Sequence, residues 1–172
     1  PIVNDFNVNT DEDVIYTFTQ GNFTWNFSDV DGDILAQIKI VTLPSALAGV
    51  LKYNGIAVTV NQLVTTANIG LLTLDPVANY DGTASFDWNG YDGVAYAVTD
   101  KTLTVLIWAT NDAPTVSNST ETTNEDTTYT HISADFTSVF TDTDGDLLSK
   151  IKIITLPNAS HGVLKLSGIS IT

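Results

Sequence analysis

Residues 12–59 recur 113 positions later, at residues 125–172, with no insertion or deletion between the two copies. The segment Asp29–Asp33, which reads Asp-Val-Asp-Gly-Asp, returns at Asp142–Asp146 as Asp-Thr-Asp-Gly-Asp. A fixed internal period constrains the fold more than any other feature of a sequence does. Because this unit has the size of a domain, the pattern predicts a tandem array of whole domains.

The two copies differ in length. Residues 1–113 make a complete repeat, and residues 114–172 match only its first half, so we predict a complete domain followed by a truncated one. Half a sandwich leaves one side of its core and several strand edges uncovered. Two interpretations stay open: another chain covers this half by strand exchange or edge pairing, or the half is held by its junction and by neighbouring molecules. Pro1 matches Pro114, which follows Asn-Asp-Ala, so we expect a segment of a longer array.

Apolar residues recur along the chain at the short spacing of β-strands. Turn signals such as Asn54-Gly55 separate these segments. Several short strands at this spacing predict an all-β sandwich or barrel. No window has a helical period over three turns, and residues 61–70 fit either a short helical turn or a loop. The expected strands lie within residues 14–18, 37–43, 71–74, 84–88 and 103–108.

The balance of charges limits what this chain can bind. There are 20 acidic residues against 6 lysines, no arginine, and a formal net charge of −14. Such a surface repels the phosphates of nucleic acids and attracts divalent cations. Cysteine is absent, so disulfides and thiolate metal sites are excluded. No stretch approaches the roughly 20 apolar residues of a membrane span. The alternative explanation of the charge is an acidic surface kept for solubility or for life in salt.

The repeated Asp-x-Asp-Gly-Asp segment is the main clue to function. Three carboxylates at alternate positions around a glycine turn repel one another, and a hard cation removes that conflict. Calcium takes six to eight oxygen ligands in irregular geometry, and glycine permits the sharp turn. The longer loop, the glutamate at its twelfth position and the flanking helices of an EF-hand are absent. Aspartate and glycine are common in turns, so the return of the motif at a fixed offset is what makes it informative.

A wider set of residues, spread over the whole chain, forms a recognisable pattern. Its members are Glu12-Asp13, Asp29–Asp33, Leu43-Pro44, Ala78–Gly82, Ser85-Phe86, Asp92-Gly93 and Asn111–Pro114. This pattern resembles the tandem cadherin-like (dystroglycan-type) repeats of large bacterial surface proteins. The resemblance implies seven-stranded Greek-key, immunoglobulin-like sandwiches linked end to end, with Ca²⁺ bound at each joint.

The resemblance also implies a set of metal ligands. Asp75 stands where cadherins carry Asp-Arg-Glu, but the arginine and the glutamate are missing here. The ligands implied at the joint between the copies are Glu12, Asp75, Asn111, Asp112, Asp142, Asp144 and Asp146. Those implied toward a preceding repeat are Asp29, Asp31, Asp33 and Asp92.

We therefore expect a calcium-dependent structural or adhesive module of an extracellular, cell-surface array. Its partners would be neighbouring repeats, further copies of the chain, or a glycan or cell-surface ligand. The alternative is a carbohydrate-binding module of a secreted polysaccharide-active protein, with Trp25 or Trp88 as the platform, although aromatic residues in strands more often belong to the core. Catalysis is not expected, because no Ser-His-Asp set recurs with the repeat.

Overall fold

A computed structural model describes all of residues 1–172. The chain divides into two compact units, Pro1–Asn111 and Asp112–Thr172. We call them unit 1 and unit 2 and describe each by itself. The predicted boundary lies two residues further along the chain, after Ala113.

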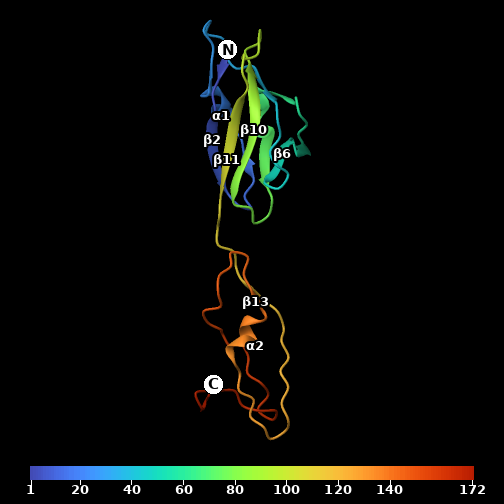
Figure 1. The fold of residues 1–172 in the computed structure, drawn as a ribbon, viewed down its shortest axis with the longest axis vertical. Helices are drawn as coiled ribbons and strands as arrows, with labels where there is room; N and C mark the ends of the chain where they lie inside the picture. The colour runs from blue at the N-terminus through green and yellow to red at the C-terminus, as the bar shows by residue number, and fades with distance from the viewer. The chain divides into compact units, whose positions relative to one another are not determined.

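Unit 1 is built from two sheets and a few short elements (Figure 1). The five-stranded sheet has the order β2-β11-β10-β5-β8, with β2 at Phe6–Asp11, β11 at Lys101–Trp108, β10 at Gly82–Tyr91, β5 at Gln37–Ile40 and β8 at Leu63–Thr65. The four-stranded sheet has the order β3-β9-β6-β7, with β3 at Tyr16–Thr17, β9 at Leu72–Pro76, β6 at Gly49–Tyr53 and β7 at Ile56–Ala57. The remaining elements are the pair β1 (Ile2–Val3) and β4 (Phe27–Ser28), helix α1 (Gln20–Thr24) and the 3₁₀ helix η1 (Thr66–Leu71).

The predicted all-β sandwich is confirmed. Each of the five expected strand segments contains or overlaps a strand. Residues 61–70, expected to be a short helical turn or a loop, hold most of η1 but also the strand β8, which neither alternative predicted. The two main sheets of unit 1 hold five and four strands, whereas the resemblance implied seven strands in all. No helix in the structure is long and apolar enough to cross a membrane.

Side chains that alternate along β10 and β11 fill the space between the sheets. Ala84, Phe86 and Trp88 of β10 are buried, as are the inward-facing residues of β11. The indole of Trp88 lies edge-on to the ring of Phe23, with 5.0 Å between ring centroids, and Phe18 packs edge-on to Phe86 at 5.8 Å. Edge-to-face contacts of this kind stabilise a core beyond the area that they bury.

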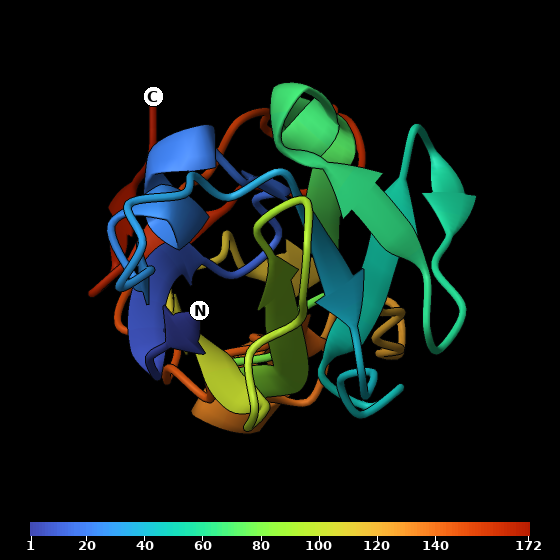
Figure 2. The same cartoon turned by 90° about the horizontal axis from the view of Figure 1, so that it is seen from above.

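The turn between β6 and β7 follows from its sequence. Asn54 and Gly55 both have positive φ, at 50° and 77°, as a two-residue type I′ hairpin turn requires. The hairpin that they close extends to one side of unit 1 (Figures 1 and 2). Ser167 and Gly168 adopt the same conformation in unit 2, at 50° and 81°.

Unit 2 keeps only short elements. They are β12 (Thr115–Val116), which pairs with β13 (Phe140–Thr141), helix α2 (Ser133–Thr137), and the hairpin of β14 (Lys165–Leu166) and β15 (Ile169–Ser170). Each of them is the counterpart of an element of unit 1. No sheet in unit 2 has more than two strands.

Candidate metal site

Three carboxylates come together at the end of unit 1 that carries the amino terminus. Asp29 and Asp33 belong to the loop between β4 and β5, and Asp92 begins the loop that follows β10. One oxygen of each lies within 4.8 Å of the others. The site therefore joins two loops that are about 60 residues apart in sequence.

Strand register explains why these loops meet. Tyr91, at the end of β10, pairs with Gln37, at the start of β5. The residues just outside this pair are consequently neighbours, and the amide of Ala36 donates to the carbonyl of Tyr91 at 2.8 Å. Asp92 is thus placed beside the loop that contains the Asp-x-Asp-Gly-Asp motif.

The loops themselves are shaped by aspartate side chains that accept hydrogen bonds from nearby amides. The carboxylate of Asp29 accepts from the amide of Asp31 at 2.8 Å, and Gly32 has a φ of +87°, which favours glycine. The carboxylate of Asp92 accepts from the amides of Val94 and Ala95, both at 2.6 Å. These bonds hold two of the three carboxylates in place.

The carboxyl groups of Asp29 and Asp92 both have a pKa below that of an ordinary aspartate. The ammonium of Pro1 lies 2.9 Å from Asp29, and its hydrogen bond, followed by that from the Asp31 amide, lowers the pKa of Asp29. Hydrogen bonds from Ala95 and then Val94 lower the pKa of Asp92. Asp29 and Asp92 are therefore both ionised at neutral pH, side by side.

The spacing of the oxygens suits a single hard cation. Two oxygens on opposite sides of a calcium ion, each at about 2.4 Å, lie at most about 4.8 Å apart. The three carboxylates would supply three of the six to eight oxygens that calcium takes, and backbone carbonyls or water would supply the others. Any cation that prefers carboxylate oxygens meets the same geometry.

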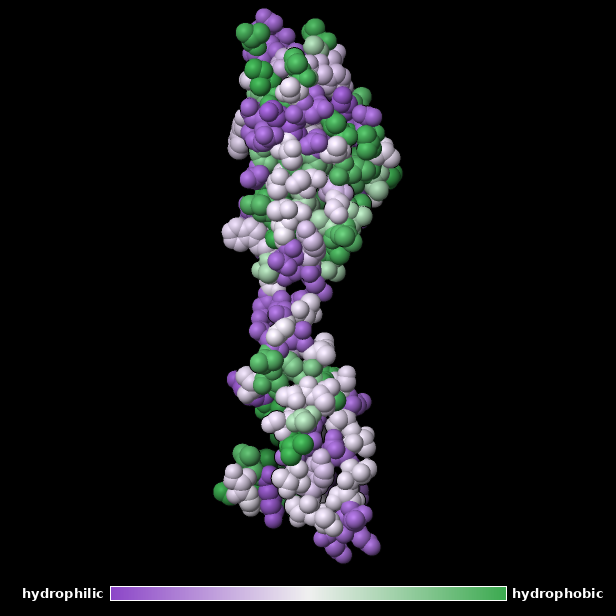
Figure 3. Space-filling model, in the orientation of Figure 1, coloured by the Kyte–Doolittle hydropathy of each residue, from purple (hydrophilic) through white to green (hydrophobic).

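Asp31, the fourth carboxylate expected at this end, lies outside the group of three and is exposed. The amide of Asp31 donates to the carboxylate of Asp29 within the turn. Apolar side chains flank the site instead: Val30, Ile34 and Val94 are between 80% and 96% exposed. Polar and apolar residues accordingly alternate over the surface of this end of unit 1 (Figure 3).

Glu12 and Asp75 form contacts within unit 1 that the sequence did not predict. Glu12 is buried, its amide donates to the carbonyl of Trp108 at 2.8 Å, and its carboxylate accepts from the amide of Thr110 at 2.6 Å. It thereby fixes the segment that leaves β11. Asp75, on β9, forms an ion pair with Lys52 on the adjacent strand β6 at 2.5 Å.

The second Asp-x-Asp-Gly-Asp motif forms the same turn in unit 2. The carboxylate of Asp142 accepts from the amides of Asp144 and Asp146 at 3.0 and 3.1 Å, and Gly145 has a φ of +81°. Asp144 accepts from the amide of Asp112 at 2.6 Å. Within unit 2 these residues do not gather three carboxylates as the first motif does. Asn111, the last of the expected ligands, ends unit 1.

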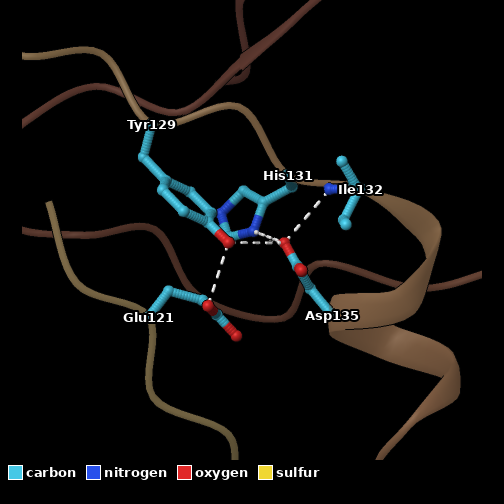
Figure 4. A network of polar contacts seen from close by, with 5 residues as sticks. All are labelled: Glu121, Tyr129, His131, Ile132 and Asp135. Atoms are coloured by element: carbon cyan, nitrogen blue, oxygen red, sulfur yellow. Dashed lines mark hydrogen bonds and ion pairs between the residues drawn. The ribbon is translucent and has the colours of Figure 1, made fainter.

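Residues outside the Asp-x-Asp-Gly-Asp motif form a polar network in unit 2 (Figure 4). The hydroxyl of Tyr129 lies 2.9 Å from Glu121 and 3.0 Å from Asp135, and Asp135 also lies 3.2 Å from the imidazole of His131. The bond to Glu121, then burial and the bond to Asp135, raise the pKa of Tyr129. Burial alone would raise the pKa of Asp135, but hydrogen bonds from Ile132, Tyr129 and His131 lower it.

Comparison of the two copies could have identified this network. Glu121 and His131 stand at the positions of the apolar residues Val8 and Phe18. Tyr129 and Asp135 stand at the positions of Tyr16 and Asn22, whose side chains also form a hydrogen bond, so unit 2 extends a polar contact that unit 1 already has.

The two tryptophans considered as sugar-binding platforms differ in their exposure to solvent. Trp88 is fully buried, so the hypothesis that it forms a platform is wrong, because its ring is needed between the sheets. Trp25 follows α1 and is 87% exposed.

Neither a scan against models of protein families nor a search of curated proteins finds a match to this chain.

Proposed function

We propose that this chain is a calcium-dependent structural and adhesive module of an extracellular repeat array of the cadherin-like type. Calcium would bind where a repeat begins and make its junction with the preceding repeat rigid. The observation that carries the proposal is the group formed by Asp29, Asp33 and Asp92, together with the return of the Asp-x-Asp-Gly-Asp turn in unit 2.

The mechanism is electrostatic. Carboxylates within 4.8 Å of one another repel when they are ionised, and a divalent cation replaces that repulsion with attraction. A ligand that binds only the folded state stabilises it by about 2.7 kcal/mol at a hundredfold excess over its Kd. Extracellular modules often bind calcium with Kd values of roughly 10⁻⁴–10⁻³ M, so millimolar calcium would fill such a site largely.

The apolar side chains around the site support a role in contacts between proteins. Val30, Ile34 and Val94 are exposed beside the carboxylates, and Leu147, the counterpart of Ile34, is exposed beside the second motif. A divalent cation removes most of the negative charge of the three carboxylates beside these apolar side chains. A surface of that kind suits packing against the end of an adjacent repeat.

The test is thermal unfolding of the chain in millimolar calcium and in excess chelator. We expect calcium to raise the melting temperature of unit 1, and Asp33→Asn to remove most of that increase. Asp81→Asn is the matched control, because it removes one exposed charge outside the group and should leave the increase intact. Equal melting curves with calcium and with chelator would refute the metal site.

One observation favours glycan binding as a second candidate function. Trp25 is 87% exposed, and its indole lies against Gly21, so a flat aromatic face is held at the surface. Such faces bind sugar rings. Retardation on soluble glycans that Trp25→Ala abolishes would support this function, and equal mobility of both forms would exclude it for the glycans used.

A further inference from the structure

The dipeptide Asn-Gly occurs twice in the chain, at Asn54-Gly55 and at Asn89-Gly90. In this dipeptide the asparagine side chain can react with its own backbone, because glycine has no Cβ to keep the following amide nitrogen away from the carboxamide. The two copies of the dipeptide have opposite surroundings in the folded chain, and these surroundings decide which of them can react.

Asn54-Gly55 forms the exposed turn between β6 and β7. The carboxamide of Asn54 makes no hydrogen bond within the chain, and the amide of Gly55 donates to no atom of the chain. A Cβ added to Gly55 would meet no atom within 4 Å, so the space around this residue is open. Both reacting groups are therefore free and exposed to solvent.

Asn89-Gly90 lies near the end of β10 and is held on all sides. Asn89 is 4% exposed, and its Nδ2 donates to the carbonyl of Ala97 at 3.1 Å and to the carboxylate of Asp100 at 2.6 Å. Gly90 lies in the pairing of β10 with β5, and a Cβ added to it would lie 2.9 Å from the ring of Phe27. A reaction here would require the five-stranded sheet to open.

We infer that Asn54 is a site of spontaneous deamidation in the folded chain and that Asn89 is protected from it. The inference is independent of the proposed function.

The reaction needs only water and hydroxide. The amide nitrogen of Gly55 gives up its proton to hydroxide and attacks Cγ of Asn54. A five-membered succinimide ring closes through the new N–Cγ bond while the Cγ–Nδ2 bond breaks, and ammonia leaves with a proton taken from water. A water molecule then opens the ring. Cleavage of the N–Cγ bond gives aspartate, and cleavage between the nitrogen and the main-chain carbonyl carbon gives isoaspartate.

Closing the ring rotates the backbone of Asn54 out of its type I′ turn, in which φ is 50°. This opening costs little, because β7 has two exposed residues and pairs only with β6 at the edge of its sheet. One hydrogen bond, from the amide of Asn54 to the carbonyl of Leu71 at 2.9 Å, joins the turn to η1. Edge hairpins open at a free energy far below that of global unfolding, which the opening around Asn89 approaches.

Isoaspartate changes the hairpin more than aspartate does. It places one extra atom in the main chain, so the two-residue turn that sets the pairing of β6 with β7 cannot form. The amide of Val58, which donates to the carbonyl of Leu51 at 2.9 Å, comes directly after that pairing. Deamidation at Asn54 therefore loosens one edge of the four-stranded sheet.

The first experiment incubates the 172-residue chain at mildly alkaline pH, both folded and unfolded in denaturant, and follows the two asparagines by tandem mass spectrometry. The ratio of the unfolded to the folded rate gives the protection of each site. We expect the protection of Asn89 to exceed that of Asn54 at least about tenfold, since a difference of 1.4 kcal/mol in the cost of opening suffices. Equal protection of the two sites would overturn the inference.

The second experiment uses Asn54→Ser as the matched variant. Unit 2 already has Ser167-Gly168 in the same turn conformation, with φ of 50° and 81°, so the variant should fold as the parent chain does. After incubation, the amide of Val58 should lose its protection from exchange in the isoaspartate fraction of the parent chain and keep it in the variant. Equal protection of this amide in both would show that the modification does not reach the hairpin, against the inference.

Discussion

Helix α1 of unit 1 and helix α2 of unit 2 occupy equivalent positions, as do the pairs β1–β4 and β12–β13 and the hairpins β6–β7 and β14–β15. The tripeptide Ile-Lys-Ile behaves differently. At residues 38–40 it forms most of strand β5, and at residues 151–153 the same three residues lie outside any strand. The two units therefore share their local elements and differ in their long-range ones.

This difference shows what a strand needs. An isolated segment with high β-propensity gains little, because cross-strand pairs and burial supply most of the stability of a sheet. The elements common to both units find their partners within about 30 residues, so the cost of closing the loop between them is modest. Strand β5 depends on β10, about 50 residues away, and without such a partner its sequence does not extend into a sheet.

The largest expected effect contrasts two equivalent phenylalanines. Phe23 is fully buried and packs edge-on to Trp88, whereas its counterpart Phe136 is only partly buried. Phe23→Ala should lower the free energy of unfolding of unit 1 by about 3–5 kcal/mol. Phe136→Ala should cost less than about 1.5 kcal/mol, because little packing is lost.

Denaturant unfolding followed by tryptophan fluorescence reports on unit 1 alone, since Trp25, Trp88 and Trp108 all lie there. Phe136→Ala should leave that transition unchanged. Amide exchange within unit 2 measures the cost of Phe136→Ala there. A loss equal to that of Phe23→Ala in unit 1 would mean that unit 2 has a packed core of its own, and the contrast between the units would fail.

Much of unit 1 could be predicted because its signals are local. Alternation of apolar residues placed β5, β10 and β11, and Asn54-Gly55 placed a hairpin turn. The Asp-x-Asp-Gly-Asp turn was equally visible, since the side chain of its first aspartate bonds to an amide two residues later.

The composition of the candidate site could be predicted only in part. Asp29, Asp33 and Asp92 were all among the expected ligands, but the same resemblance also included Asp31, which lies outside the group. The register of β10 against β5 decides which carboxylates converge, and no single segment encodes that register. The same reason hid the contacts of Glu12 with Thr110 and of Asp75 with Lys52, which join residues far apart in sequence.

A medium-sized effect is expected at the start of the two helices. The hydroxyl of Thr19 accepts a hydrogen bond from the amide of Asn22 and caps α1. Ile132 stands at the same position before α2, and its side chain has no atom that can accept such a bond. Thr19→Ala should destabilise unit 1 by about 1 kcal/mol. Ile132→Thr should stabilise α2 by a similar amount.

Amide exchange within each helix measures both changes. Ile132 is 60% exposed, so its replacement removes little burial and mainly tests the cap. If Ile132→Thr speeds exchange in α2, burial of the isoleucine outweighs capping, and the helices are not equivalent local elements.

The smallest expected effect is a loss of stability at acid pH. It should be similar in both units, because the hydrogen bonds that cause it are local. Amides of Ala95 and Val94 lower the pKa of Asp92 in unit 1, and the amide of Ile132, with Tyr129 and His131, lowers that of Asp135 in unit 2. An aspartate with a lowered pKa in the folded state stabilises that state above its unfolded pKa of about 3.9. The stabilisation is lost as the pH falls from about 3.9 through the lower, folded value.

Carbon-13 titration of the side-chain carboxyl groups should therefore give midpoints below 3.8 for both Asp92 and Asp135. Exchange of the amides of Val94 and Ala95 should rise over the same pH range, while the amides of β10 and β11 stay protected. A midpoint below 3.8 for Asp92 but not for Asp135 would show that the polar network of unit 2 does not hold in solution. Local hydrogen bonds would then depend on a complete sandwich, as the long strands do, and the separation between local and long-range elements would have to be redrawn.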